Sequence, residues 1–185
     1  MSLKTQTLLA SELSLAETLG VDPDPTHRKR LKALEIASAQ IRGITRQHFD
    51  LVTADQIDLR GSWGDEIRLP QRPVLDVSEI QVRWQGSQVF DVLSSSAYTW
   101  DRAGRLRGVC SIWGGPGGTV RPTYDHGFAE IPEDIEAVCL AMARRWLQNP
   151  GAVASETLVD YSVTYGPIGL TEDEAKTLED YRRWP

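Results

Sequence analysis

Cysteine and histidine are scarce in this sequence of 185 residues. The two cysteines, Cys110 and Cys139, are too few for a disulfide framework or a cysteine-rich metal cage, and we expect both to be reduced core residues. The three histidines, His27, His48 and His126, show no spacing typical of a metal site. We therefore predict neither a metal nor a cofactor.

An excess of positive charge is also missing, because the net charge is −6 and lysine occurs only at positions 4, 29, 32 and 176. This balance argues against a protein that holds nucleic acid by neutralising phosphates, although it permits DNA to pass without being gripped. No apolar run reaches transmembrane length and no leader pattern opens the sequence, so we expect no association with a membrane. The apolar content of 41% can support a folded core.

Motifs for catalysis or nucleotide binding are lacking as well. Asp125 and His126 beside Glu130 could imitate an acid/base pair, but hydrogen bonds around a turn explain them better. The segment Gly114–Gly118 has neither the lysine nor the Ser/Thr of a phosphate loop, so we interpret it as a flexible loop tip. The six tryptophans and five tyrosines are dispersed, which is typical of core and interface residues. We predict that the protein is not an enzyme.

The stretch from Val120 to Trp146 carries the clearest pattern of structure. Apolar residues alternate along 120–125, which predicts a half-buried strand. Pro122 cannot donate to a ladder, so this strand should be an edge or have its proline nitrogen pointing outward. Gly127 allows a turn, and Pro132 suits the first position of a helix. The predicted buried stripe of that helix is Ile135, Val138, Cys139, Met142 and Trp146.

Further apolar residues lie outside this stripe, namely Ala137, Leu140, Ala141 and Leu147. A helix that is apolar around much of its circumference packs between layers or between subunits. The earlier helix, 27–48, carries small residues such as Ala37 beside Ile41, which permits close approach by another helix. Ala37, Ile41, Leu140 and Leu147 are our candidates for packing between subunits. The many basic residues of 27–48 are explained by a solvated face or by a contact with a subunit or phosphate.

The order of these patterns predicts an α+β fold. Helices are expected at 9–19, 27–48 and 133–148, with a small antiparallel β-sheet or open barrel inserted at 55–125. These segments form a single domain, 1–150, with a helical core of two long helices and short terminal helices. Residues 151–185 form an extended arm ending in a helix at 172–183, which opens with the capping box Thr171–Glu174. Such a short helix has little core of its own, so we expect it to dock on a partner.

Several of these segments together resemble the head-to-tail adaptor (head-tail connector) proteins of long-tailed double-stranded DNA phages and gene transfer agents. The matching motifs lie in the family's order, within Ala33–Arg46, Leu69–Val77, Tyr98–Leu106, Val120–Pro132 and Gly151–Arg183. The third reads Tyr-Thr-Trp-Asp-Arg-Ala-Gly-Arg-Leu, and the fourth places His-Gly-Phe after a Thr-Tyr pair. The resemblance covers nearly the whole chain.

The resemblance implies a structural role in a virion. Members of this family form a ring, commonly of twelve copies, beneath the portal protein at the capsid vertex. The ring extends the DNA channel, which double-stranded DNA traverses without specific binding, and it joins the capsid to the tail through a stopper or tail-completion protein. The expected location is therefore the virion neck, reached from the host cytoplasm before assembly.

The C-terminal arm is the expected contact with the portal. Its candidate partner-binding residues are Tyr161, Tyr165, Leu170, Tyr181, Arg182, Arg183 and Trp184, of which the last four are types that anchor interfaces. The segment Gly114–Gly118 is a candidate for a contact with the tail side or the channel. Two alternatives remain: a stopper or tail-completion protein of the same neck, and a soluble enzyme, for which no convergent polar site is visible.

Overall fold

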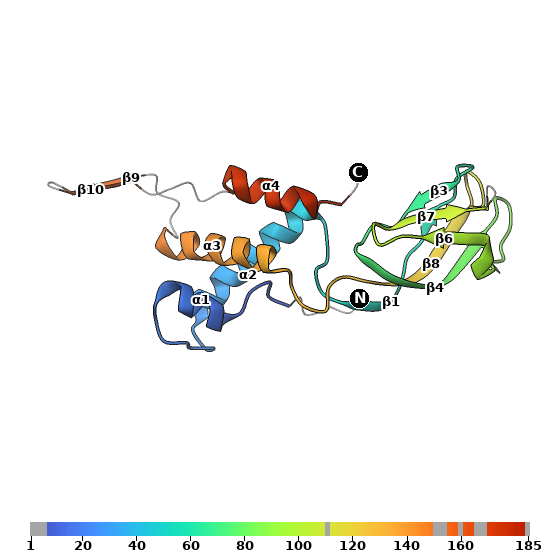
Figure 1. Ribbon diagram of the computed structural model, residues 1–185. Helices are drawn as coiled ribbons and strands as arrows, with labels where there is room; N and C mark the ends of the chain where they lie inside the picture. The colour runs from blue at the N-terminus through green and yellow to red at the C-terminus, as the bar shows by residue number, and fades with distance from the viewer. Residues whose placement is uncertain (1–6, 110–111, 150–154, 159–160, 165–169, 184–185) are drawn as a thin grey trace. The chain divides into compact units, whose positions relative to one another are not determined.

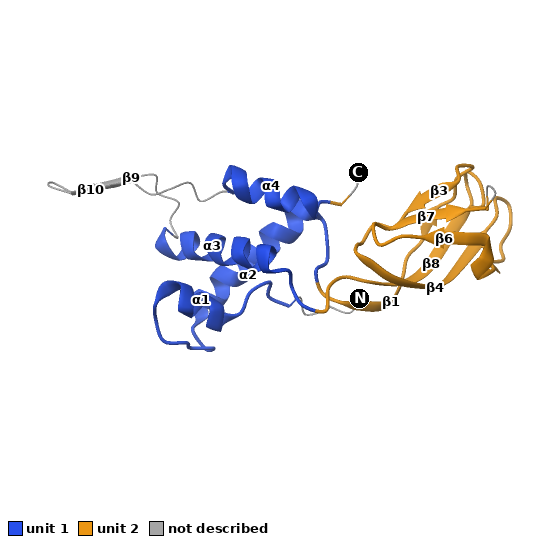
Figure 2. Cartoon of the chain, viewed as in Figure 1, with its two compact units in different colours: residues 1–49, 130–182 blue, residues 50–129, 183–185 orange. Residues whose placement is uncertain are grey.

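The chain forms two compact units in the computed structural model, which describes residues 7–109, 112–149, 155–158, 161–164 and 170–183 (Figure 1). Unit 1 comprises residues 1–49 and 130–182, and unit 2 comprises residues 50–129 and 183–185 (Figure 2). Unit 2 is thus inserted into the sequence of unit 1, between its second and third helices. The prediction of one domain over 1–150 stays a prediction.

Unit 1 is built from the four helices α1 (Glu12–Leu19), α2 (Arg28–Thr45), α3 (Glu133–Gln148) and α4 (Glu172–Asp180). Helix α2 packs mainly against α3, and α4 contacts both (Figure 1). Two antiparallel strands, β9 (Ser155–Leu158) and β10 (Tyr161–Thr164), lie in the sequence between α3 and α4.

Local chemistry explains where the helices begin and end. The Ser11 hydroxyl accepts a hydrogen bond from the Ser14 N–H, so α1 begins at Glu12 and not at residue 9. Arg46 adopts a left-handed conformation, with φ of 56°, so α2 ends at Thr45 and not at residue 48. Helix α3 has the predicted bounds. Helix α4 has the predicted capping box but ends at Asp180, short of residue 183.

The core of unit 1 lies between α2 and α3. The small residues Ala33 and Ala37 are buried on α2, as expected for closely approaching helices. Four of the five predicted stripe residues of α3 are buried, and Trp146 is half-buried. Two of the basic residues of α2 have structural roles, because Arg30 pairs with the buried Glu12 at 2.7 Å and Arg42 donates to the Thr7 carbonyl oxygen. The solvated-face interpretation is therefore wrong for these two arginines.

Unit 2 consists of two antiparallel sheets. The larger sheet has the order β1 (Val52–Gln56), β8 (Thr119–His126), β4 (Val74–Arg83), β5 (Asp91–Val92), and β2 (Leu59–Arg60) also pairs with β8. The smaller sheet has the order β3 (Glu66–Arg68), β7 (Arg105–Gly108), β6 (Tyr98–Trp100), and a 3-10 turn at Ser95–Ala97 precedes β6. Strands β6 and β7 form an antiparallel pair.

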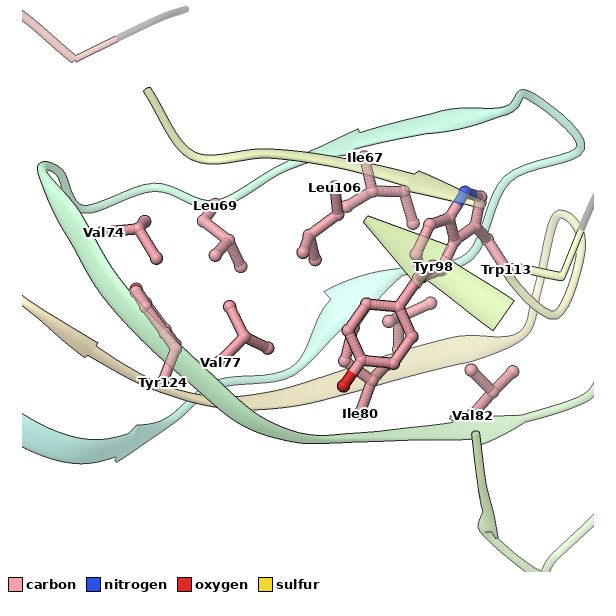
Figure 3. Packing of buried hydrophobic residues seen from close by; sticks show 11 residues of the cluster. Ile67, Leu69, Val74, Val77, Ile80, Val82, Tyr98, Leu106, Trp113 and Tyr124 are labelled. Carbon is pink, nitrogen blue, oxygen red and sulfur yellow. The ribbon is translucent and has the colours of Figure 1, made fainter. Parts of the chain in front are cut away.

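A single apolar cluster fills the space between these sheets (Figure 3). Alternate residues of β8 are buried, because side chains along a strand point to opposite faces. The pairing of β4 with β8 has two register shifts, so the cluster residues of β4 do not alternate strictly. Trp113 is fully buried and is among the largest side chains in the cluster. The other members are Ile67, Leu69, Val74, Val77, Ile80, Val82, Tyr98, Leu106, Val120 and Tyr124.

Pro122 occupies a central strand, so the expectation of an edge strand is wrong. Strand β8 pairs with β4 on one side and with both β1 and β2 on the other. The Pro122 carbonyl faces the break between β1 and β2, where it accepts a weak hydrogen bond of 3.5 Å from the Ile57 N–H. The nitrogen and carbonyl of one strand residue point to the same side. The proline nitrogen therefore faces the interrupted part of the ladder, where no donor is needed.

The segment Gly114–Gly118 is a packed turn and not the flexible tip that the sequence suggested. Gly114, Gly115 and Gly118 are buried. The Gly118 N–H donates to the Gly115 carbonyl at 2.9 Å, and the Gly61 N–H donates to the Gly118 carbonyl at 3.0 Å. A Cβ at Gly118 would overlap backbone atoms of Gly114 and Arg83, so only glycine fits this close approach.

The two ends of the inserted unit meet beside Gly127. Asp50 and Phe128 form a parallel β-bridge at the two points where the chain enters and leaves unit 2. Gly127 has φ of +96°, and a Cβ there would overlap the Asp50 carbonyl oxygen. The glycine of the predicted turn therefore permits the close approach of two backbone segments.

The predicted fold class is confirmed, because helices and antiparallel sheets occupy separate parts of the chain. None of the helices in the described ranges combines the length and the apolar character that a membrane span requires.

Candidate interaction surfaces

Helix α4 docks on α2 and α3 of its own chain through an apolar contact. Leu178 is fully buried, although α4 has only nine residues. The Tyr181 ring lies 5.8 Å from the Phe49 ring, centroid to centroid, in a tilted arrangement favourable for aromatic pairs. We call the part of α2 and α3 that receives this helix, together with Phe49, the α4 seat.

An ion pair joins the start of α4 to the end of α3. Arg145 donates to both carboxylate oxygens of Glu174, at 2.8 and 2.6 Å, and both side chains are largely shielded from solvent. Burial by itself would raise the pKa of the Glu174 carboxyl. Hydrogen bonds from Arg145 and from the Thr171 N–H outweigh burial, so the pKa is lowered and Glu174 stays ionised. The bidentate geometry fixes the orientation of α4 as well as its position.

A second polar contact lies at the other end of α4. The Tyr181 hydroxyl lies 2.9 and 2.8 Å from the two carboxylate oxygens of Asp134, in the first turn of α3. Burial and this hydrogen bond to a carboxylate raise the pKa of Tyr181 to about 12. The phenol therefore remains a donor throughout the neutral pH range.

We expected the terminal helix to dock on a partner, but in the structure it docks on α2 and α3 of its own chain. Tyr181 is half-buried in the α4 seat, and Leu170 is half-buried as well. Arg182 and Arg183 are exposed. Tyr161 lies in β10, but its side chain is outside the described part of the structure, as are the residues Tyr165 and Trp184. Of the four candidates whose side chains the structure describes, Tyr181 thus contacts its own chain, and Arg182 and Arg183 are exposed to solvent.

A shallow hollow of about 490 Å³ lies on the side of α3 that faces away from the core of unit 1. Ala137, Leu140 and Ala141 of α3 and Thr18 of α1 contribute to its lining, together with polar residues near the end of α3. Leu140 and Leu147 are both half-buried. Ala37 and Ile41 are 2% and 0% exposed in the core of unit 1, so they present no surface to another subunit.

The possible acid/base pair Asp125–His126 serves the sheet of unit 2. Asp125 accepts a hydrogen bond of 2.7 Å from the Ala54 N–H, and His126 Nε2 lies 3.1 Å from Asp55 Oδ2. His126 is only 1% exposed. Both residues thus hold β1 against β8 through hydrogen bonds between strands, and not around a turn as the sequence suggested. Within the described ranges, no three His, Cys, Asp or Glu side chains are grouped so that they could hold a metal ion.

One exposed patch of unit 2 was not anticipated from the sequence. Trp84, Val89 and Val92 are exposed around the β4–β5 connection, with Val89 at 66%. The Phe90 ring beside them is stacked under Arg121, whose guanidinium carbon lies 4.1 Å from the ring centroid. Arg121 in turn donates to both carboxylate oxygens of Asp58, at 2.6 and 2.9 Å. The available signal was the pair of valines, Val89 and Val92, within four residues of the sequence.

Chains of gene transfer agent (GTA) particles share this fold. A chain in the structure described as the neck of a native GTA particle computed with C12 symmetry is 17% identical, with a TM-score of 0.57, over 100% of this chain and 94% of that chain. A chain in the neck of an empty GTA particle computed with C6 symmetry is 19% identical, with a TM-score of 0.55, over 94% of this chain and 91% of that chain. A chain in the virion of a native GTA particle is 17% identical, with a TM-score of 0.56, over 98% of this chain and 94% of that chain.

No protein-family model and no curated protein matches the sequence. At identities below one fifth, the three likenesses establish the fold, and they extend over nearly the full length of both chains. The resemblance to head-tail connectors drawn from the sequence motifs is thereby confirmed as a shared fold.

Proposed function

We propose that this protein is a structural component of a virion neck, which forms a ring under the portal, extends the DNA channel and joins the capsid to the tail. The observation that carries the proposal is the shared fold with chains from GTA necks that were computed with C6 and C12 symmetry. Cyclic symmetry of that kind requires a heterologous contact, in which one face of each copy meets a different face of the next.

The side of α3 that faces away from the core of unit 1, which we call its open side, supports the proposal of a ring. Leu140 and Leu147 offer partly exposed apolar surface, and the hollow between α1 and α3 has room for side chains of a neighbouring copy. An apolar surface of this kind is stabilised when another subunit covers it. The net charge of −6 per copy supports a channel that DNA traverses without being bound. This proposal requires neither catalysis nor a cofactor.

Electron cryo-microscopy of particles that contain this chain is the direct test, with the map focused on the capsid vertex. We expect a symmetric ring of this chain between portal and tail, with Leu140 and Leu147 at the contact between copies. A ring placed one layer further from the head would favour a stopper or tail-completion protein, which is the second candidate. Absence of the chain from the neck would contradict both.

The segment 153–185 is proposed to attach the ring to the portal, and the docking of α4 permits a sharper test than its deletion. Arg145 and Glu174 are in contact, so the two ends of the connector between α3 and α4 lie close together. Replacing residues 153–168 by a short Gly/Ser linker should therefore leave α4 in its seat. We expect this variant to fold but to lose binding to portal-bearing heads, whereas unchanged binding would contradict the role of the β9–β10 segment.

A further inference from the structure

The connector between α3 and α4 is much longer than the docking of α4 requires. It comprises residues 149–171, although the last turn of α3 and the first turn of α4 touch through Arg145 and Glu174. Packed neighbouring helices are usually joined by about 2–8 residues. A connector of this length therefore does not serve only to return the chain to its own α3.

Helix α4 depends on its seat, and the seat is defined by contacts that any copy of the chain can supply. A helix of nine residues is marginal in water by itself. Its stability comes from the burial of Leu178, the Arg145–Glu174 pair and the Tyr181–Asp134 hydrogen bond. All three contacts join α4 to other segments of unit 1, so the same contacts would form if the helix came from another molecule.

The reach of the connector matches the spacing of neighbouring copies. With the β9–β10 pair left intact, residues 149–154 and 165–171 still span roughly 40 Å when extended. A compact unit of about 100 residues has a radius of gyration of roughly 13 Å, so adjacent units in contact have centres about 30 Å apart. An α4 helix can thus arrive at the seat of the next copy.

We infer that in the assembled ring α4 of each copy docks in the α4 seat of its neighbour, so that the C-terminal helices are exchanged around the ring. This inference rests on the ring of the proposed function. Exchange of an identical element loses none of the contacts seen within one chain. The ring also holds the exchanged helix at an effective concentration in the millimolar range, as tethering does for linked binding modules. Each α4 seat is therefore filled by the α4 helix of the neighbouring copy, and these contacts link the copies around the ring.

Cross-linking of the full chain in assembled particles distinguishes exchange from docking within one copy. Arg145→Cys and Glu174→Cys are introduced together in a Cys110→Ser background and bridged with a short bismaleimide. Cys139 can stay, because burial raises the pKa of its thiol to about 11 and keeps it unreactive at neutral pH. Each single-cysteine variant serves as the control and should give no ladder.

Exchange predicts a denaturing-gel ladder that extends to the size of the ring. Rings that yield only internally closed monomers would overturn the exchange and leave the proposed function intact. If electron microscopy of the same sample shows no ring, both proposals fall together. Microscopy of the particles therefore separates the two kinds of failure.

A mixing experiment provides a second measurement that does not depend on cysteines. Arg145→Glu and Glu174→Arg each place like charges at the contact, both within one copy and between identical copies. In a mixed ring, opposite charges meet only between unlike neighbours. We expect protease protection of α4 to be lost in each single variant and to return substantially in the mixture. The double variant Arg145→Glu/Glu174→Arg controls for folding, and a mixture no better protected than its components would overturn the exchange.

Discussion

At the scale of single residues, three positions have well-defined local contacts. Gly127 has φ of +96° against the Asp50 carbonyl, and Pro122 sits at the break between β1 and β2. Tyr181 links the last turn of α4 to the first turn of α3. Single substitutions at Gly127 and Tyr181 test the contacts of these two residues.

Gly127→Ala should destabilise unit 2 by more than about 2 kcal/mol, because the added methyl group combines backbone strain with overlap of the Asp50 carbonyl. Gly86 is the matched control. Its φ is +83°, but a Cβ there meets nothing within 4 Å. Gly86→Ala should therefore cost only about 1 kcal/mol, the conformational term alone. Chemical denaturation of both variants measures the difference, and equal losses would show that the overlap is relieved.

Tyr181→Phe should weaken the docking of α4 by about 1 kcal/mol, because it removes the hydrogen bond to Asp134 but keeps the ring against Phe49. The pKa of Tyr181 is raised to about 12, so the folded state favours the protonated phenol. Its contribution is complete below pH 10 and is lost as the pH rises from about 10 to about 12. Amide exchange of α4 in wild type and variant measures this difference, which should shrink over that range.

At the scale of elements, α4 is the helix whose stability depends most clearly on contacts with other segments. Its charged surface is exposed, and Leu178 is its only buried residue. The capping box satisfies backbone N–H groups at the start of the helix, and the bidentate pair with Arg145 orients it. Loss of any one contact should therefore weaken the docking of the helix locally without unfolding the rest of unit 1.

Leu178→Ala should release α4, because truncation of a fully buried leucine costs about 2–5 kcal/mol. Amide protons of 172–180 should then exchange at least about 30-fold faster, while those of α2 and α3 change little. Glu179→Ala on the exposed side of the same helix is the matched control and should stay within about 0.5 kcal/mol. Equal exchange in the two variants would show that the leucine does not hold the helix.

Local signals in the sequence predicted the elements well wherever a nearby residue decides the structure. Pro132 preceded the start of α3, Thr171 and Glu174 predicted the capping box, and the alternation around Tyr124 predicted β8. What the sequence did not reveal depends on distant partners. The docking of α4 requires Arg145 to contact Glu174. The place of Pro122 in a central strand depends on the break between β1 and β2, which pair with β8 on the side opposite β4.

The surfaces were harder to predict than the elements, for a related reason. Ala37 and Ile41 have the small and apolar character of a packing surface, but that surface is covered by α3 of the same chain. Periodicity shows that a helix face is buried and does not show what buries it. Leu140 was selected by the opposite argument, because it fell outside the stripe, and it lies on the open side of α3.

At the scale of the whole molecule, the chain carries two separate cores. The cluster around Trp113 draws every member from residues 67–124, within unit 2. The core of unit 1 is formed by helices on both sides of this insertion in the sequence. Each unit therefore has the internal packing that independent folding requires.

Residues 50–129 expressed alone should fold, because the apolar cluster lies entirely within them. We expect a circular dichroism spectrum of β-structure, cooperative unfolding in denaturant and a red shift of the tryptophan emission on unfolding, when the buried Trp113 becomes exposed. Trp113→Ala in the same fragment should cost about 3–5 kcal/mol and abolish the cooperative transition. A fragment without a cooperative transition would show that unit 2 requires the helices.

The β-bridge between Asp50 and Phe128 has a consequence for how such proteins diversify. The chain leaves unit 2 beside the point where it enters. The segment between Asp50 and Phe128 can therefore be lengthened, shortened or exchanged by recombination while these two residues stay in place. Lineages can thus replace the sheet unit as one cassette, and the helices that precede and follow it in the gene need not change at the same time.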